Sequence, residues 1–268
     1  MAEASLFQPH RFRTAASHYL AGRPAYAPRL IEHVRRFVGL SRADRVLDLG
    51  CGPGMLAGAF ARLAGEVVAM DPEPEMLRIA EAEFGAVGRI RFARGSSFDL
   101  SPSLGRFRLV TMGRSFQWMD RPATLRSLET LVEPDGAVAL FSSGHRDAPD
   151  TGWTAAYQAL VRRYAADDSS HPRCRADGTL RHEAILLASA FDLLDEITVI
   201  ERREVTVQQL VERALSRSST APDRLGDAVP RLAAEIEALL VPLAKDGTLP
   251  EVIATTALIA RRPEATHP

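Results

Sequence analysis

One ten-residue stretch, RVLDLGCGPG at residues 45–54, restricts the fold of this chain more than any other. A short apolar run passes through the carboxylate of Asp48 and ends in three alternate glycines, Gly50, Gly52 and Gly54. A buried strand that enters a glycine-rich turn before a helix is typical of the first unit of an open α/β sheet. The glycines also allow a ligand to approach the backbone without meeting Cβ atoms.

The rest of the chain continues this alternation of apolar runs and helical patterns. The first part predicts strands at 45–49, 66–70, 90–93, 109–112 and 137–142, and helices at 55–63, 74–83 and 122–130. The part after Ser143 predicts a helix at 153–164, a strand at 193–207, helices at 207–218 and 228–243, and a strand at 251–261. We therefore expect a doubly wound, mostly parallel α/β sheet of seven strands, with a helical lid or insertion after the fifth strand.

Charge and hydropathy narrow the possible partners and compartment. The 33 basic residues nearly balance the 34 acidic residues, which argues against a nucleic-acid partner. No apolar run is long enough to span a bilayer, and the first residues lack the apolar core of a secretory signal. We expect Cys51 and Cys174 to be free thiols and the protein to be cytoplasmic, without a membrane partner. The histidines and cysteines show no metal-ligand spacing, so no metal is expected.

The glycine turn discriminates between two kinds of nucleotide cofactor. The NAD fingerprint G-x-G-x-x-G, started at Gly50, requires a third glycine where this chain has Met55. Pro53 removes one amide donor at the helix start, where a pyrophosphate needs such donors. Asp48 would repel a pyrophosphate, whereas it suits a ligand with positive charge such as S-adenosylmethionine. Asp71, at the end of the second predicted strand, is placed to accept hydrogen bonds from ribose hydroxyls of either cofactor.

Three stretches, VLDLGCGPG, VVAMDPEPEML and FRLVTMGRSFQWMD, resemble the successive motifs of class I S-adenosylmethionine-dependent methyltransferases. The resemblance is to the small-molecule branch that includes trans-aconitate methyltransferase and ubiquinone-pathway methyltransferases. It covers roughly residues 15–142 and the TALIARR ending, and it implies that the last strand is antiparallel within the sheet. It also implies that the cofactor contacts Tyr19, Arg23, Asp48, Gly50, Cys51, Gly52, Gly54, Asp71, Pro72, Met76, Ser96, Ser97, Phe98, Gly113 and Arg114.

The resemblance implies a role for several of these residues. Asp71 would bind the ribose, and Pro72 and Met76 would pack on the adenine. The family has an acid where this chain has Ser96 and Ser97, so a hydroxyl, a backbone carbonyl or the Phe98 amide would meet the adenine edge here. The stretch HYLAGRPAYAPRL resembles the family's entry helix, in which Arg23 would neutralise the cofactor carboxylate and Tyr19 would close over the methyl group. Alternatively, this stretch is a capping helix whose aromatic residues only pack.

Methyl transfer requires few catalytic groups, because the leaving group is already activated and the protein mainly aligns the nucleophile and excludes water. We consider three catalytic candidates, namely His145 after the fifth strand, Gln117 after the fourth, and His18 beside Tyr19. Glutamine cannot act as a base, so Gln117 would only orient a ligand. Substrate contacts are expected from Trp118 and, if the helix at 153–164 forms a lid, from Trp153 and Tyr157. The alternative for Trp153 and Tyr157 is a packed helix face.

We accordingly predict an enzyme that transfers a methyl group from S-adenosylmethionine to an oxygen or nitrogen of a small-molecule acceptor in secondary metabolism. The alternatives are a non-catalytic S-adenosylmethionine-binding protein and an NAD-dependent oxidoreductase. We divide the chain into an N-terminal helical cap (1–40), a cofactor-binding half (41–144), a substrate-binding insertion (145–190) and a C-terminal part of the core (191–268). A monomer or homodimer is expected.

Overall fold

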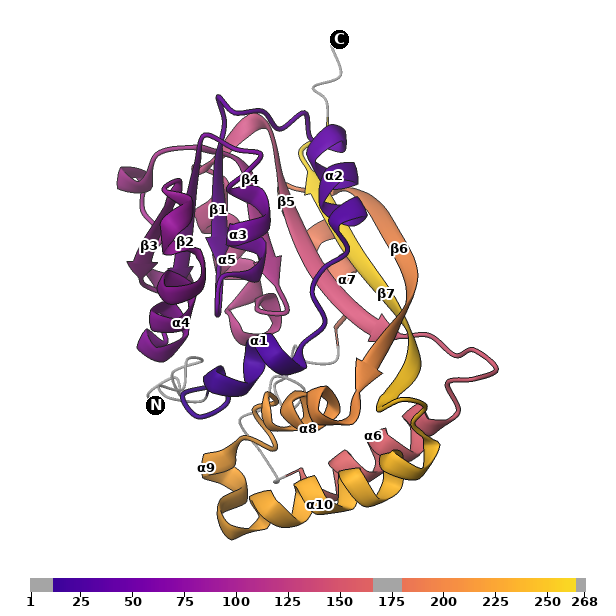
Figure 1. The fold of residues 1–268 in the computed structure, drawn as a ribbon. Helices are drawn as coiled ribbons and strands as arrows, with labels where there is room; N and C mark the ends of the chain where they lie inside the picture. Colours follow the sequence, from indigo (N-terminus) through magenta and orange to yellow (C-terminus); the bar gives the residue numbers. More distant parts are fainter. Residues whose placement is uncertain (1–11, 166–179, 264–268) are drawn as a thin grey trace.

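The computed structural model describes residues 12–165 and 180–263, which contain one seven-stranded sheet in the order β3-β2-β1-β4-β5-β7-β6 (Figure 1). β1 to β5 pair in parallel, and β7 lies antiparallel between β5 and β6. The predicted doubly wound sheet with an antiparallel last strand is thus confirmed. The strands are β1 (Arg45–Leu49), β2 (Glu66–Asp71), β3 (Ile90–Arg94), β4 (Phe107–Gly113), β5 (Val132–His145), β6 (Leu193–Thr206) and β7 (Thr248–Arg261).

Helices cover both faces of the sheet and one of its ends (Figure 1). The structure forms every predicted helix, although most differ by a few residues at their ends. The N-terminal region that was expected to be helical contains α1 and α2, and the structure adds α7 and α9. None of the helices in the two described ranges is long and apolar enough to cross a membrane. The α-helices are α1 (Tyr19–Gly22), α2 (Pro28–Phe37), α3 (Met55–Phe60), α4 (Pro74–Phe84), α5 (Arg121–Leu128), α6 (Trp153–Tyr164), α7 (His182–Leu187), α8 (Val207–Leu215), α9 (Pro222–Leu225) and α10 (Val229–Leu240).

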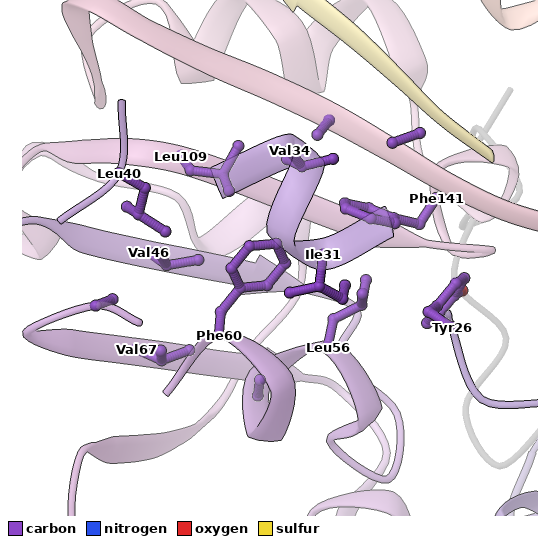
Figure 2. Packing of buried hydrophobic residues seen from close by; sticks show 14 of the residues in the cluster. Tyr26, Ile31, Val34, Leu40, Val46, Leu56, Phe60, Val67, Leu109 and Phe141 are labelled. Carbon is purple, nitrogen blue, oxygen red and sulfur yellow. The ribbon is translucent and has the colours of Figure 1, made fainter. Parts of the chain in front are cut away.

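Two apolar cores fix the helices to the sheet. In the core drawn in Figure 2, Ile31 of α2 and Phe60 of α3 pack over Val46 and Leu109 of the central strands. The edge of the Phe60 ring also meets Phe141 of β5, with 6.0 Å between ring centroids. The opposite face packs against α5 and α7. The central strands pack apolar side chains on both of their faces, and their sequences are therefore continuous apolar runs.

A third core lies at one end of the sheet and includes the end of β6 and the start of β7. It joins α6, α8 and α10, which gather beyond one end of the sheet in Figure 1 and which we call the helical cap. The sequence-based division assigned α8 and α10 to the C-terminal part of the main core, and only residues 145–190 to an insertion. In the structure, side chains from both segments bury one another, including Tyr157, Leu160, Leu210, Leu232 and Ile236. The cap therefore depends on two stretches that are far apart in the chain.

The helical cap in turn holds the N-terminal segment. A Cβ atom at Gly22 would overlap the backbone nitrogen of Arg213, so α1 approaches α8 as closely as two backbones can. Arg213 donates from Nε to the Gly22 carbonyl at 2.8 Å and from Nη1 to Glu251 at 2.7 Å. Both Arg213 and Glu251 are buried. One ion pair therefore ties together α1, α8 and β7.

Candidate active site

The glycine turn after β1 has the conformation that its sequence predicts. Gly50, Gly52 and Gly54 all have positive φ angles, of 67°, 54° and 83°, which disfavour residues with a Cβ atom. Gly50 also lacks room, because a Cβ there would lie 2.6 Å from the Cβ of Ser115. The amides of Gly50 and Cys51 donate to the Met70 carbonyl, which anchors the turn to β2. Gly54 is the N-cap of α3.

Asp48 supports this turn from below. Its side chain is only 1% exposed and accepts hydrogen bonds from the Ala57 amide at 2.9 Å and from the Thr111 hydroxyl at 2.9 Å. Burial raises the pKa of Asp48 to about 7. The sequence placed this acid opposite a cationic part of the ligand. The structure instead gives each carboxylate oxygen a protein partner and fixes the first turn of α3 to β1 and β4.

Asp71 is largely buried, but it lines the cavity beside the glycine turn. Its Oδ2 accepts a hydrogen bond from the Gly52 amide at 2.8 Å, and its Oδ1 accepts one from the Glu73 amide at 2.9 Å. Burial raises the pKa of Asp71 to about 6. These two bonds point the carboxylate across the glycine turn and leave lone pairs on both oxygens for a further donor.

A first cavity opens beside Asp71 at the carboxyl ends of β1 and β2. Most of the predicted cofactor contacts line this first cavity. They are Tyr19, Gly50, Gly52, Asp71, Pro72, Met76, Ser96, Ser97, Phe98 and Arg114. Asp48, Cys51 and Gly113 line instead a small third cavity on the other side of the turn, and burial raises the pKa of the Cys51 thiol.

The loop after β3 closes one side of the first cavity. Asp99 accepts hydrogen bonds from both the amide and the hydroxyl of Ser96 at 2.8 Å, and Ser96 Oγ accepts from the Phe98 amide. The Phe98 amide thus already has a partner in the protein. Its ring is 60% exposed, although it borders an apolar cavity. A flat ligand ring is the natural partner of such a side chain.

Arg114 stands at the junction of all three cavities. Its φ angle of 57° is unusual for a non-glycine residue and turns the chain directly after β4. The guanidinium lies over the rings of Tyr19 and Tyr26, at 5.6 Å and 5.2 Å from their centroids. Its Nε is buried without a hydrogen-bond partner among the residues that the structure describes. This unsatisfied donor fits an anionic ligand group.

Arg23 was expected to neutralise the carboxylate of the cofactor. The structure places it over the Tyr19 ring and pairs it with Ser216 at the end of α8, through Nε to Oγ at 2.8 Å and Nη2 to the carbonyl at 3.1 Å. Arg23 lines a second, larger cavity and does not border the first. Of the two arginines predicted to contact the cofactor, only Arg114 borders the first cavity.

The second and larger cavity lies beyond Arg114. Residues of β5 and β7 line it, among them Ser142 and Thr256, which are opposite residues of the two strands. Its walls come from α7, from the turn after β4 and from the chain after α8, which contribute His182, Gln117 and Arg217. Segments that are remote in sequence thus enclose one space next to the first cavity.

The three catalytic candidates differ in their positions. Gln117 borders the second cavity and donates from Nε2 to the Arg114 carbonyl at 2.7 Å. His145 is not among the residues that line the cavities, and its Nε2 faces Arg213 at 3.4 Å. His18 lies against α8 and binds Glu212 at 2.6 Å. Of these candidates, only Gln117 lines one of the two larger cavities.

The residues predicted to contact the substrate lie in two different places. Trp118 lines both the first and the second cavity and meets Phe12 edge-on at 5.3 Å between centroids. Trp153 and Tyr157 are 6% and 0% exposed, and their polar atoms donate to the carbonyls of Pro250 and Leu210. They belong to the interior of the cap, which was the alternative interpretation of their helical spacing.

Sequence reasoning missed Arg217 in the second cavity and gave His182 less weight than His145 and His18. His182 borders the cavity and packs against the Phe116 ring at 5.2 Å, while its Nδ1 lies 3.3 Å from Arg121 Nη1. Arginine can only donate, so Nδ1 of His182 accepts and its Nε2 carries the proton of the neutral ring. Arg217 follows α8 in an ordinary polar stretch, RSST, which carries no local signal of a site. Only the tertiary arrangement of α8 against α1 brings it to the cavity.

The strand order, the antiparallel β7, the glycine turn after β1 and the acid that ends β2 together define the class I methyltransferase architecture. Residues 46–136 match the family model described as a methyltransferase domain. The chain is a class I S-adenosylmethionine-dependent methyltransferase, as the sequence motifs predicted.

Known proteins from several bacteria are similar to this chain. An uncharacterized methyltransferase of Mycobacterium tuberculosis is 25% identical over 77% of this chain and 76% of its own length. A ubiquinone biosynthesis O-methyltransferase of Xanthomonas campestris is 33% identical over 43% of this chain and 49% of its own length. A methyltransferase structure from Geobacter sulfurreducens, in complex with S-adenosyl-L-homocysteine, has a TM-score of 0.53 at 16% identity and covers 96% of this chain and 100% of its own.

Proposed function

We propose that this methyltransferase acts on an oxygen or nitrogen atom of a small molecule that binds in the second cavity. The observation that carries the proposal is that four residues, Phe12, Tyr19, Arg114 and Trp118, line both the first and the second cavity. A methyl group bound at this border would face an acceptor on the other side. In-line displacement requires this kind of opposed placement.

The residues of the first cavity fit the parts of the cofactor. Asp71 would accept the ribose hydroxyls, and Met76 and Phe98 would enclose the adenine. Arg114, with its buried unsatisfied Nε, would bind the carboxylate of the methionine part. S-adenosylmethionine itself supplies an activated methyl group on a sulfonium. The protein then contributes alignment and exclusion of water, for which Tyr19 and Trp118 are placed at the border.

Neither of the two described histidines near the second cavity, His182 and His145, offers a free basic nitrogen. His182 accepts from Arg121 through Nδ1, which leaves a protonated Nε2. Nε2 of His145 likewise accepts a hydrogen bond from Arg213, and burial lowers the pKa of His145. We therefore propose that the acceptor atom attacks without a histidine base, and that Gln117, held by the Arg114 carbonyl, orients it.

The relatives support an oxygen acceptor. The Xanthomonas relative is named as an O-methyltransferase of ubiquinone biosynthesis, and a relative from Pseudescherichia vulneris, 30% identical over 49% of this chain, is named as a malonyl-[acyl-carrier protein] O-methyltransferase. The chain spans about half the length of each of these two relatives. The roles in secondary metabolism and in the cytoplasm, the monomer or homodimer, and the absence of a nucleic-acid partner stay predictions.

Two measurements test this function. Calorimetry with S-adenosylhomocysteine should show binding, and NAD should show none. Release of S-adenosylhomocysteine from S-adenosylmethionine should then depend on an added small-molecule acceptor, and Trp118→Ala should lower this turnover more than it weakens cofactor binding. Tight cofactor binding without turnover across a broad panel of alcohols, phenols, acids and amines would instead favour a non-catalytic binding protein.

A further inference from the structure

The second cavity concentrates positive charge. Four arginines that line it, Arg23, Arg114, Arg146 and Arg217, have no carboxylate partner among the residues that the structure describes. The fifth arginine of the lining, Arg181, is already paired with an acid at 3.2 Å. Cations outnumber the unpaired acids of this cavity, so the space is complementary to an anion.

Two of these arginines, Arg23 and Arg217, are partly buried. Burial lowers the pKa of Arg23 to about 10, and it also lowers that of Arg217, while each also experiences repulsion from neighbouring arginines. The adjacent Arg213 differs from them, because the buried carboxylate of Glu251 neutralises it. Two guanidinium groups without a counter-ion destabilise the fold at this point unless an anion arrives.

The cofactor would supply an anionic partner for only one of these arginines. It carries a single carboxylate, and Arg114 is the arginine that borders the glycine turn and both larger cavities. Arg146 and Arg217 line the second cavity but not the first, so they lie on the acceptor's side of the border. Hydroxyl donors of Ser218, Ser219 and Thr256 line the same cavity.

We propose that the methyl acceptor carries an oxyanionic group, a carboxylate or a phosphate, and that Arg217 and Arg146 bind this group in the second cavity. The inference rests on the proposed function and specifies the substrate class of the same site. An anion held by Arg217 leaves the rest of the acceptor free to reach the border at Arg114 and Trp118. Bidentate hydrogen bonds from a guanidinium also fix the orientation of a planar oxyanion, which favours one acceptor atom over others.

The test uses the full chain saturated with S-adenosylhomocysteine. Calorimetry would measure binding of benzoate, citrate and inorganic phosphate, with benzamide as the neutral counterpart of benzoate, at constant ionic strength. We expect at least one anion to bind and benzamide to bind more weakly. Preference for phosphate would indicate a phosphorylated acceptor and preference for benzoate or citrate a carboxylic acid, and either result supports the proposal. Binding of no anion at millimolar concentration, or equal binding of benzoate and benzamide, would overturn it.

Variants locate the anion within the cavity. Arg217→Gln should weaken binding of the anionic probe by about 10- to 100-fold, the loss expected for charge-assisted hydrogen bonds, while binding of S-adenosylhomocysteine stays unchanged. Arg217→Lys should retain part of the affinity, and Arg126→Gln, an exposed arginine outside the cavities, should change nothing. The thermal midpoint of Arg217→Gln should equal or exceed that of the parent. Unchanged probe affinity in Arg217→Gln overturns the proposal, whereas failure to bind S-adenosylhomocysteine in the parent would contradict the proposed function instead.

Discussion

At the scale of single residues, two acids around one glycine turn have different roles. Asp48 is buried and holds α3 and β4 through the Ala57 amide and the Thr111 hydroxyl. Asp71 uses backbone amides of the turn to aim its carboxylate at the first cavity. The same side-chain chemistry thus stabilises the turn in one case and is presented to a ligand in the other.

Asp71→Ala should weaken binding of S-adenosylhomocysteine by about 1–3 kcal/mol, because ribose hydroxyls would lose their acceptor. Calorimetry measures this loss directly. Asp192→Ala, at an exposed acid outside the cavities, is the matched control and should bind normally. An unchanged dissociation constant in Asp71→Ala would remove Asp71 from the cofactor site.

Cofactor binding should also depend on pH through Asp71. Burial raises the pKa of Asp71 to about 6, above the value of about 3.9 for an unfolded chain. The native state therefore binds more protons than the unfolded state between these values, so the contribution of Asp71 to stability decreases as pH rises through this range. Binding has the opposite trend, because only the carboxylate accepts two ribose hydroxyls. Affinity for S-adenosylhomocysteine should fall as pH falls through about 6, and Asp71→Asn should lose this dependence in calorimetric titrations.

At the scale of elements, α1 is too short to be stable by itself, because isolated helices of a single turn do not persist in water. Its position comes from α8. Gly22 allows the two backbones to touch, Arg213 binds the Gly22 carbonyl, and Arg23 binds Ser216. Tyr19, one turn earlier, is thereby held at the border between the two larger cavities.

Gly22→Ala should separate α1 from α8. The added methyl group overlaps the backbone of Arg213, and overpacking of this kind destabilises a fold by about 1–3 kcal/mol. Urea unfolding would measure this loss, and calorimetry should show weaker cofactor binding because Tyr19 shifts. Gly152→Ala provides the control, since a Cβ atom there meets nothing within 4 Å and its φ of −58° suits alanine. Equal stability of the two variants would contradict the close contact.

At the scale of the whole molecule, the apolar core of the cap adjoins the sheet at β6 and β7, and polar contacts add to this connection. The strongest link is the buried pair of Arg213 and Glu251, in which Nη1 and Nη2 donate to the two carboxylate oxygens at 2.7 Å and 3.2 Å. Arg203 lies 3.7 Å from the same carboxylate. Glu251 begins the stretch of β7 that was predicted from sequence, so the pair fixes the cap to the centre of the fold.

Arg213→Met should destabilise the protein by about 3–5 kcal/mol, because it leaves the Glu251 carboxylate buried with a weaker partner. Adding Glu251→Gln should recover part of this loss, since the double variant no longer buries an unpaired charge. Chemical unfolding of the two single variants and the double variant forms a complete cycle. Additive losses would show that the pair contributes no coupling between the cap and the sheet.

The parts of the molecule that could be predicted from sequence are those formed by neighbours in the chain. The strands, the glycine turn and the position of Asp71 follow from patterns within about 30 residues, so their prediction needed no tertiary information. The direction of Trp153 and Tyr157 could not be predicted in this way, because it depends on Leu210 and Pro250, which lie far along the chain. Arg217 illustrates the same limit, since its role depends on how α8 packs against α1.

The cap segment between β6 and β7 leaves and re-enters the sheet at adjacent positions. Thr206 and Thr248 are opposite residues in the last registered pair of the two strands. The segment between them therefore begins and ends at neighbouring positions. A short hairpin turn could replace it without a change of strand register. Evolution or an engineer can exchange this segment as a module, which would replace Arg217 and the support of α1 together, while the pairing of β6 with β7 is kept.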